Sequence, residues 1–315
     1  MIISSLLASI VPILFYLFVL WKMDKNEPEP IKFVILNFLW GAIGAVLFSL
    51  AGSFILVEQL ANVVTTDSSL SLFQSVLVAP FVEEFMKGSF LLITVMSKKF
   101  DNITDGLVYG GAIGLGFGMT ENFFYFVTYS ETFQQWIFIV TIRTLFSALM
   151  HCIATASFGA FLGSAKFTNS YKKYLLPVIG FFLAFLIHFS WNFGVSFNST
   201  YYSSFGLMIV FFITFYFIFN KSIKNEEEII ENELLFESET GLFPYEFISI
   251  VKGADNLEDI EIDNNVKISF VKAATKLAFR KNQARHSIGS KRDFYLSEVE
   301  KYRNRISELS DSFNF

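Results

Sequence analysis

Charged side chains are scarce in this sequence. Asp, Glu, Lys and Arg make up 17% of its 315 residues, whereas 53% are hydrophobic and 18% are aromatic. The mean hydropathy of +0.49 lies far above the range of soluble globular domains. The composition therefore predicts a polytopic membrane protein. The net charge of −5 gives no sign of a surface that binds nucleic acid.

Cysteine is almost absent as well. Cys152 is the single cysteine, so no disulfide can form within the chain and no redox compartment can be inferred. The first apolar run also lacks the marks of a cleaved signal peptide, because no basic residue precedes it and no small-residue cleavage pattern comes before Lys22. We expect this run to be retained as a membrane-spanning helix.

Seven apolar runs are long enough, or nearly so, to cross a hydrocarbon core of roughly 30 Å. They predict an all-α fold, a polytopic membrane helix bundle of about seven transmembrane helices. The runs cover residues 2–21, 32–57, 70–96, 106–129, 136–163, 175–196 and 204–220.

Lysines alternate between the loops that connect these runs. The loops after the second, fourth and sixth runs hold no lysine or arginine, whereas the other connections and the start of the tail hold Lys22, Lys25, Lys32, Lys98, Lys99, Lys166, Lys172, Lys173, Lys221 and Lys224. Basic loops favour the cytoplasmic side. The alternation predicts an outside N-terminus, a cytoplasmic C-terminus and an odd number of spans.

The chain is expected to divide into a transmembrane domain of residues 1–220 and a cytoplasmic tail domain of residues 221–315. In the tail, the acidic stretch from Asn225 to Glu239 predicts a solvated helix. Two helical patterns on either side of Gly289 predict a helical hairpin with a small core. The core positions are Phe270, Ala273, Ala274, Leu277 and Ala278 before Gly289, and Tyr295, Val299, Tyr302, Ile306 and Leu309 after it. His286 is expected at the surface.

Two adjacent glutamates and a lysine interrupt the third apolar run, in the stretch Pro80-Phe81-Val82-Glu83-Glu84-Phe85-Met86-Lys87. Each charged residue near the centre of a spanning helix costs roughly 2.5–3.5 kcal/mol, so such residues indicate function by default. An ion pair between Glu83 and Lys87 is the structural alternative, since four residues separate them. That pair needs one glutamate, and the run has two. Pro80 lacks an N–H group and should loosen the helix one turn before Glu84.

Further polar residues occur in the next three runs. The fourth run has a glycine at every fourth position from Gly106 to Gly118, which predicts close helix packing, and then Glu121 and Asn122. His151 of the fifth run lies in a similar ladder of small residues, with Ser147, Thr155, Gly159 and Gly163. We expect Arg143 and Asp105 to be anchors at helix ends.

His188 and Asn192 lie one turn apart in the sixth run. At about 1.5 Å of rise per residue, Glu84, Glu121, His151 and His188 fall about 12–22 Å from the outer ends of their helices. Four proton-active or metal-ligating groups from four helices are therefore expected to meet at one level.

These motifs resemble the PrsW family of bacterial intramembrane proteases. The resemblance rests on Glu-Glu-x-x-Lys at 83–87, on the glycine-rich run that ends in Phe117-x-x-x-Glu121-Asn122, and on His188-x-x-x-Asn192. It covers residues 30–220 and leaves the tail out. The family is similar to a wider group with the CAAX-prenyl endopeptidases and the Aph subunit of gamma-secretase. Glu121 stands where the CAAX enzymes have a histidine, and His151 is the residue expected to replace it.

The resemblance implies a multi-pass peptidase of the bacterial inner (plasma) membrane, in contact with membrane lipid. Its implied protein partner is a membrane-anchored substrate, of which an anti-sigma factor is one example. Glu84 is the candidate base that activates water, with Glu83 as its orienting neighbour or a second ligand, and His188 and Asn192 are candidate donors to the oxyanion. Alternatively, a divalent metal, with zinc as the first choice, is held by a set drawn from Glu84, Glu121, His151 and His188.

Metal-bound and metal-free glutamate catalysis stay open at this point. The sequence has no His-Glu-x-x-His, no Gly-x-Ser-x-Gly and no pair of membrane aspartates, which disfavours serine and aspartyl mechanisms. Two other classes also stay open. A non-catalytic scaffold of the Aph type would keep the polar cluster for assembly. A proton-coupled transporter would place such groups at the midplane but would usually show an internal repeat, and none is found.

Overall fold

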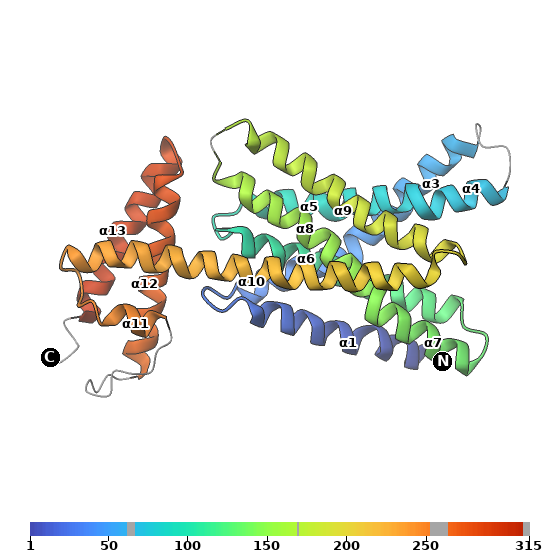
Figure 1. The fold of residues 1–315 in the computed structure, drawn as a ribbon, viewed down its shortest axis with the longest axis horizontal. Helices are drawn as coiled ribbons and strands as arrows, with labels where there is room; N and C mark the ends of the chain where they lie inside the picture. The colour runs from blue at the N-terminus through green and yellow to red at the C-terminus, as the bar shows by residue number, and fades with distance from the viewer. Residues whose placement is uncertain (62–66, 169, 253–263, 311–315) are drawn as a thin grey trace. The chain divides into compact units, whose positions relative to one another are not determined.

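The computed structural model describes residues 1–61, 67–168, 170–252 and 264–310. These residues form helices and connecting turns without a β-strand, as Figure 1 shows. They divide into two compact units. The first comprises residues 1–24, 28–166 and 171–219, and the second comprises residues 25–27, 167–170 and 220–315. The all-α fold predicted from the sequence is confirmed.

Each of the seven apolar runs is helical. In chain order the helices are α1 (Ile2–Met23), α2 (Ile31–Leu39), α3 (Val46–Ala61), α4 (Asp67–Phe73), α5 (Ala79–Val95), α6 (Ile103–Thr128), α7 (Phe133–Ile142), α8 (Ala148–Lys166), α9 (Lys172–Ser196) and α10 (Tyr201–Glu239).

Three runs contain one π-helical turn each, which joins two α-helical parts into one continuous helix. The turns are η1 (Trp40–Ala45) between α2 and α3, η2 (Gln74–Val78) between α4 and α5, and η3 (Arg143–Ser147) between α7 and α8. π-turns are rare and are frequent at functional sites. η2 ends two residues before Pro80, so the helix is irregular where the missing N–H group of this proline predicted it.

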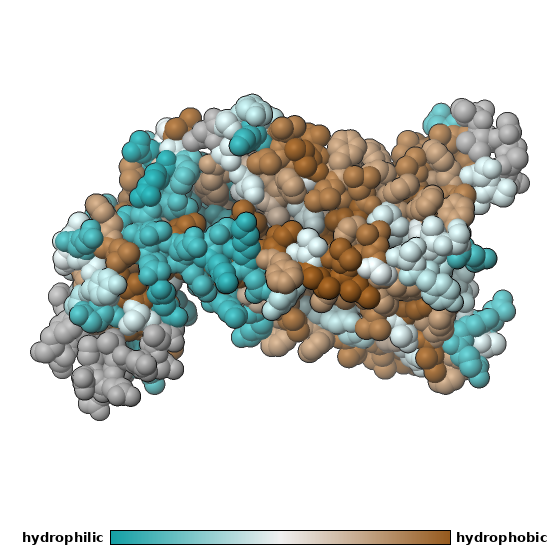
Figure 2. Space-filling view, in the orientation of Figure 1, coloured by the Kyte–Doolittle hydropathy of each residue, from teal (hydrophilic) through white to brown (hydrophobic). Residues whose placement is uncertain are grey.

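Five continuous helices of the described chain are long and apolar enough to cross a membrane: α1, α2–α3, α7–α8, α9 and α10. Of the two other runs, α4–α5 carries the buried Glu84 and Lys87, and α6 carries the glycine stripe from Gly106 to Gly118. Large hydrophobic side chains cover much of the surface of the first unit, and Figure 2 shows this for one face. Such a surface is stable in lipid and not in water. The number of spans and their orientation stay predictions.

Helix α6 lies at the centre of the first unit and packs against α8 with their backbones in contact. A Cβ atom on Gly106 would lie 2.1 Å from the carbonyl oxygen of Gly159, and one on Gly114 would lie 2.1 Å from the carbonyl oxygen of His151. Only glycine fits at such an approach. The glycine stripe therefore serves helix packing, as predicted, and it fixes the backbone of His151.

The second unit contains the end of α10 with α11 (Phe247–Val251), α12 (Asn264–Arg285) and α13 (Ser290–Ser310). Gly289, at φ +59°, separates α12 from α13, so the predicted hairpin is confirmed. Nine of the ten predicted core positions lie in its buried core or pack against it, and the tenth, Tyr295, is buried against Phe167 and Phe294. His286 is exposed, as expected.

One prediction for the tail holds only in part. The stretch from Asn225 to Glu239 is helical and exposes Glu227, Glu228 and Asn232, but Glu226, Glu233 and Glu237 are buried. Ile230 and Leu234 on the same helix belong to the core of the second unit. Glu233 pairs with Arg285 and Lys281, and Glu237 pairs with Arg303 and Lys281. The prediction relied on the acidic composition of this stretch and missed its apolar stripe at helical spacing, which includes Ile230 and Leu234.

Candidate active site

The two glutamates of α5 have different surroundings. Glu84 is buried, and both of its carboxylate oxygens have partners: Oε1 accepts from Lys87, and Oε2 accepts from the hydroxyl of Thr155 at 3.1 Å. The Glu83 side chain is 13% exposed, and its buried Oε2 atom has no hydrogen-bond partner among the residues that the structure describes. Thr155 lies one turn after His151, in the ladder that the sequence shows.

Lys87 is fully buried between three helices. Its Nζ atom lies 2.7 Å from Glu84 Oε1, 2.9 Å from His151 Nδ1 and 3.9 Å from Glu83 Oε2. It also lies 4.0 Å from the centroid of the Phe117 ring on α6. The ion pair expected between Glu83 and Lys87 is present, but Glu84 is the closer partner.

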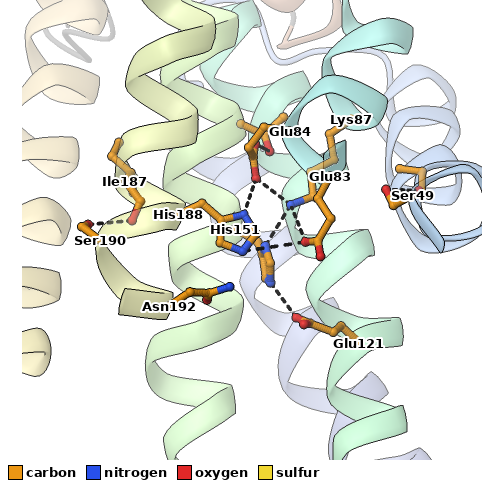
Figure 3. Close-up of polar contacts among 12 residues, drawn as sticks. Ser49, Glu83, Glu84, Lys87, Glu121, His151, Ile187, His188, Ser190 and Asn192 are labelled. Atoms are coloured by element: carbon orange, nitrogen blue, oxygen red, sulfur yellow. Dashed lines mark hydrogen bonds and ion pairs between the residues drawn. The ribbon is translucent and has the colours of Figure 1, made fainter. Parts of the chain in front are cut away.

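His188 of α9 faces both glutamates, as Figure 3 shows. Its Nδ1 atom lies 2.9 Å from Glu84 Oε1, and its Nε2 atom lies 3.7 Å from Glu83 Oε2. Because a carboxylate oxygen accepts, Nδ1 carries the proton toward Glu84. The contact at 3.7 Å is too long for a hydrogen bond.

His151 of α8 has a partner on each ring nitrogen. Nδ1 faces the Lys87 amine, and Nε2 lies 2.7 Å from Glu121 Oε2. A lysine ammonium can only donate, so Nδ1 accepts and the proton of the ring lies on Nε2, directed at Glu121. The rings of His151 and His188 are perpendicular, with centroids 4.7 Å apart.

Arg143 belongs to the site, and the expectation that it anchors a helix end is wrong. It lies on η3, where its Nη2 atom is 2.6 Å from Glu121 Oε2 and its Nε atom donates to Asn122 Oδ1 at 3.0 Å. Its guanidinium group also stacks on Tyr125, 3.5 Å from the ring centroid. Arg143 could have been found from the sequence, because a charged residue inside an apolar run indicates a functional site, as it does for the glutamates of the third run. Asp105 does lie at a helix end, in the first turn of α6, where it accepts from the backbone N–H of Asp101.

Asn192 lies beside the cluster without a hydrogen bond to His188 among the described residues. Its Nδ2 atom donates to the carbonyl oxygen of Ser75 in η2, at 2.9 Å. Asn192 thus ties α9 to the π-turn before the two glutamates. The other predicted residues, Glu83, Glu84, Glu121, His151 and His188, form one continuous network with Lys87 and Arg143.

This network has one negative charge in excess. Three carboxylates face two cations, and both histidines fit their contacts as neutral rings. The excess belongs to Glu83, because Glu84 and Glu121 each have a cation within 2.7 Å. A buried carboxylate oxygen without a partner is costly unless a proton or a cation joins it.

Among the described residues, Glu83, His151 and His188 offer ligand atoms that all lie within 4.8 Å of one another. Two ligands of a tetrahedral zinc ion lie about 3.4 Å apart at normal bond lengths, close to the spacing of Glu83 Oε2 and His188 Nε2. Ligating histidines usually direct their second nitrogen at a carboxylate. His188 does so toward Glu84 and His151 toward Glu121, so the donor set fits a divalent metal.

Comparison with known proteins gives the family. A family model described as "PrsW family intramembrane metalloprotease" matches residues 29–219. The chain belongs to the PrsW family. A protease PrsW from Oceanobacillus iheyensis is 32% identical over 198 residues, which are 60% of this chain and 82% of the relative. Those from Geobacillus kaustophilus and Bacillus subtilis are 28% and 27% identical, over 59% of this chain and 76% and 80% of their own lengths.

No solved structure matches the chain significantly. As a member of the PrsW family, the protein is an intramembrane peptidase, and the function predicted from its motifs is confirmed. The scaffold and transporter alternatives are not favoured. The match ends at residue 219, so the tail lies outside the region that defines the family.

Proposed function

We propose that this PrsW-family peptidase uses a zinc ion held by Glu83, His151 and His188. The observation that carries the proposal is the buried Oε2 atom of Glu83, which has no hydrogen-bond partner and faces Nε2 of His188. Two histidines with one carboxylate leave a fourth position open, as catalytic zinc sites require. Bound there, the metal would lower the pKa of a water molecule and polarise the substrate carbonyl.

Glu83 has a second role in this proposal. Its Oε2 atom lies 3.7 Å from His188 Nε2, and the side chain as a whole is 13% exposed. With Oε2 assigned to the metal, the other oxygen is the one left for incoming water. We assign to that oxygen the proton of the attacking water, which it then returns to the leaving amine. Glu84, the first candidate for this task from the sequence, has partners on both oxygens.

The remaining polar residues position these groups. Glu84 orients His188 through Nδ1, and Glu121 orients His151 through Nε2. Arg143 holds Glu121 in place through the same oxygen that His151 contacts. Asn192 keeps η2 next to α9 through its hydrogen bond to the carbonyl oxygen of Ser75. Its side-chain amide can donate to the oxyanion when the substrate carbonyl replaces Ser75 as the acceptor.

The substrate class follows from the location of the site between membrane-spanning helices. We propose a membrane-anchored protein as the substrate, with an anti-sigma factor as one candidate, and the bacterial inner membrane as the location. The lysine alternation supports seven spans, an outside N-terminus and a cytoplasmic tail. Reporter fusions after Thr66 and after Lys224 should then lie on opposite faces of the membrane.

The decisive experiment measures zinc and cleavage in parallel on full-length protein in lipid nanodiscs. The wild-type protein should contain about one zinc per chain and cleave a single-span reporter. A chelator should remove both, and added zinc should restore both. His188→Ala should lose both, whereas the loop variant Glu131→Gln should keep both. Cleavage that survives complete removal of metal would favour a bare glutamate mechanism.

A further inference from the structure

Lys87 brings a positive charge into a site that is built to bind another cation. Its amine is fully buried, and its closest partners are Glu84 Oε1 at 2.7 Å and His151 Nδ1 at 2.9 Å. Of the three residues in the candidate metal group, it contacts His151 by hydrogen bond and lies 3.9 Å from Glu83. An ammonium group on this spot repels a divalent ion strongly in a medium of low dielectric constant.

The nitrogen that Lys87 contacts is the one His151 has available for a metal. Its other nitrogen, Nε2, donates to Glu121, which Arg143 holds in place. A ligating histidine keeps such a carboxylate contact on its second nitrogen. Coordination through Nδ1 retains the contacts with Glu121 and Arg143, and it requires that the Lys87 amine leave.

We propose that Lys87 is a built-in competitor of the metal ion: its amine and the ion exclude each other at Nδ1 of His151. This inference rests on the proposed zinc site. In the metal-free state, Lys87 supplies a positive charge that keeps the two glutamates and His151 together. When the ion binds, Lys87 gives up one hydrogen bond.

The surroundings of Lys87 provide a second position for its amine. Glu84 Oε1 and the face of the Phe117 ring both stabilise a cation, and neither belongs to the candidate metal group. The side chain is flexible and compact at its tip, so a rotation about its last bonds is enough to leave His151. The competition lowers the affinity of the site for metal without making the apo protein unstable.

Zinc affinity tests this inference directly. Full-length protein in nanodiscs is titrated against a chromophoric zinc chelator, for the wild type, Lys87→Met and Lys87→Gln. Both variants should bind zinc about tenfold more tightly, or better, because the repulsion and the bond to His151 are removed. Lys166→Met is the matched control: Lys166 lies on the same helix as His151 but donates to the carbonyl oxygens of Ser97 and Phe100, so its affinity should equal that of the wild type.

A second set of variants locates the effect. In a His151→Ala background, Lys87→Met should give no gain in affinity, since the competed ligand is gone. In unmutated protein, zinc should make the Lys87 amine more reactive toward reductive methylation, read by peptide mass spectrometry. This measurement does not depend on the folding of any variant.

The outcomes separate the inference from the proposed function. Unchanged or weaker zinc binding by Lys87→Met, or an amine whose reactivity ignores zinc, would overturn the competition while a zinc-binding wild type keeps the metal site. If neither the wild type nor Lys87→Met binds zinc, the metal site itself is wrong, and the inference falls with it.

Discussion

The membrane unit and the tail unit each bury a cluster of ionised side chains, and only one cluster is complete. In the tail, Glu237 Oε1 lies 2.6 Å from Lys281 and 2.7 Å from Arg303, and Oε2 accepts from Arg303 at 2.9 Å. In the membrane unit, Glu84 has hydrogen bonds on both oxygens, but among the described residues the buried Oε2 atom of the neighbouring Glu83 has none, and its nearest cation, Lys87, lies 3.9 Å away.

This difference indicates what each cluster does. A buried network with every polar atom paired makes a unit rigid and specific. A network that leaves one atom unpaired stores free energy, which a ligand or a proton releases on binding. The tail cluster is therefore structural, whereas the membrane cluster is chemical. The following predictions test this assignment.

The largest effect is expected for Glu83→Gln. The amide keeps the shape of the side chain but cannot take a proton and is a poor metal ligand. The rate constant for cleavage of a single-span reporter should fall about 10²–10⁴-fold, the usual contribution of a general base. The protein should accumulate normally, because Glu83 Oε2 has no hydrogen-bond partner to lose. Near wild-type cleavage by Glu83→Gln would refute its role.

Glu84→Gln should lower activity and abundance together. Glu84 accepts from Lys87, His188 and Thr155, and its loss leaves a buried lysine without its closest counter-ion. Breaking a buried ion pair costs about 3–5 kcal/mol. Quantitative immunoblots of membrane fractions, with Glu83→Gln as the comparison, check this. Equal abundance of the two variants would show that the two glutamates are not different in the way we describe.

Arg143→Gln should have a smaller effect on chemistry. It leaves every candidate ligand in place but frees Glu121, and thereby the ring of His151. Loss of a group that orients a ligand costs about 10–100-fold in metal affinity or activity. A zinc titration and a cleavage assay on one preparation should show both losses. A loss of abundance with normal zinc binding would make Arg143 structural.

The smallest effect concerns the tail and depends on pH. Burial raises the pKa of Glu237, but hydrogen bonds from Arg303 and Lys281 outweigh it and lower the pKa below the ordinary 4.5. The unfolded state therefore takes up the proton first as pH falls. The stabilisation is complete above about pH 4.5 and is lost as pH falls through the lower folded pKa.

Hydrogen exchange of α12 and α13 in the full-length protein measures this effect. Protection should drop at acid pH in the wild type, and Glu237→Gln should lower protection at neutral pH and reduce its pH dependence. Cleavage at neutral pH should stay near the wild-type rate. A Glu237→Gln protein with unchanged protection would show that the paired cluster is not needed for tail stability.

The sequence predicted the helices and the gathering of Glu83, Glu84, Glu121, His151 and His188, because isolated polar residues stand out in apolar runs. It could not assign partners. Helical spacing pairs Glu83 with Lys87, but Lys87 Nζ lies closer to Glu84, at 2.7 Å against 3.9 Å to Glu83. The contact of Lys87 with His151 joins two different helices, so no local spacing predicts it. Arg143 was misassigned because its position near the start of a run is also typical of an anchor.

The tail shows the opposite error. Charge density alone marked residues 225–239 as solvated, and the apolar stripe with Ile230 and Leu234 was overlooked. The ion pairs of Glu233 with Arg285 and of Glu237 with Arg303 join residues 52 and 66 positions apart, and no local pattern contains them. The extent of the two domains, split at residue 220, stays a prediction.

The π-turn η2 has a consequence for how this site tolerates insertions and deletions. A π-turn holds one residue more than an α-turn, so it absorbs an extra residue without turning the helix that follows. Removing a single residue from Gln74–Val78 would restore a regular helix and leave both glutamates and Lys87 on nearly the same face. An added residue that stays α-helical would instead rotate everything after it by about 100° and turn both glutamates and Lys87 away from the histidines, although no site residue had changed. η2 is thus a place where this helix can lose one residue and keep its site.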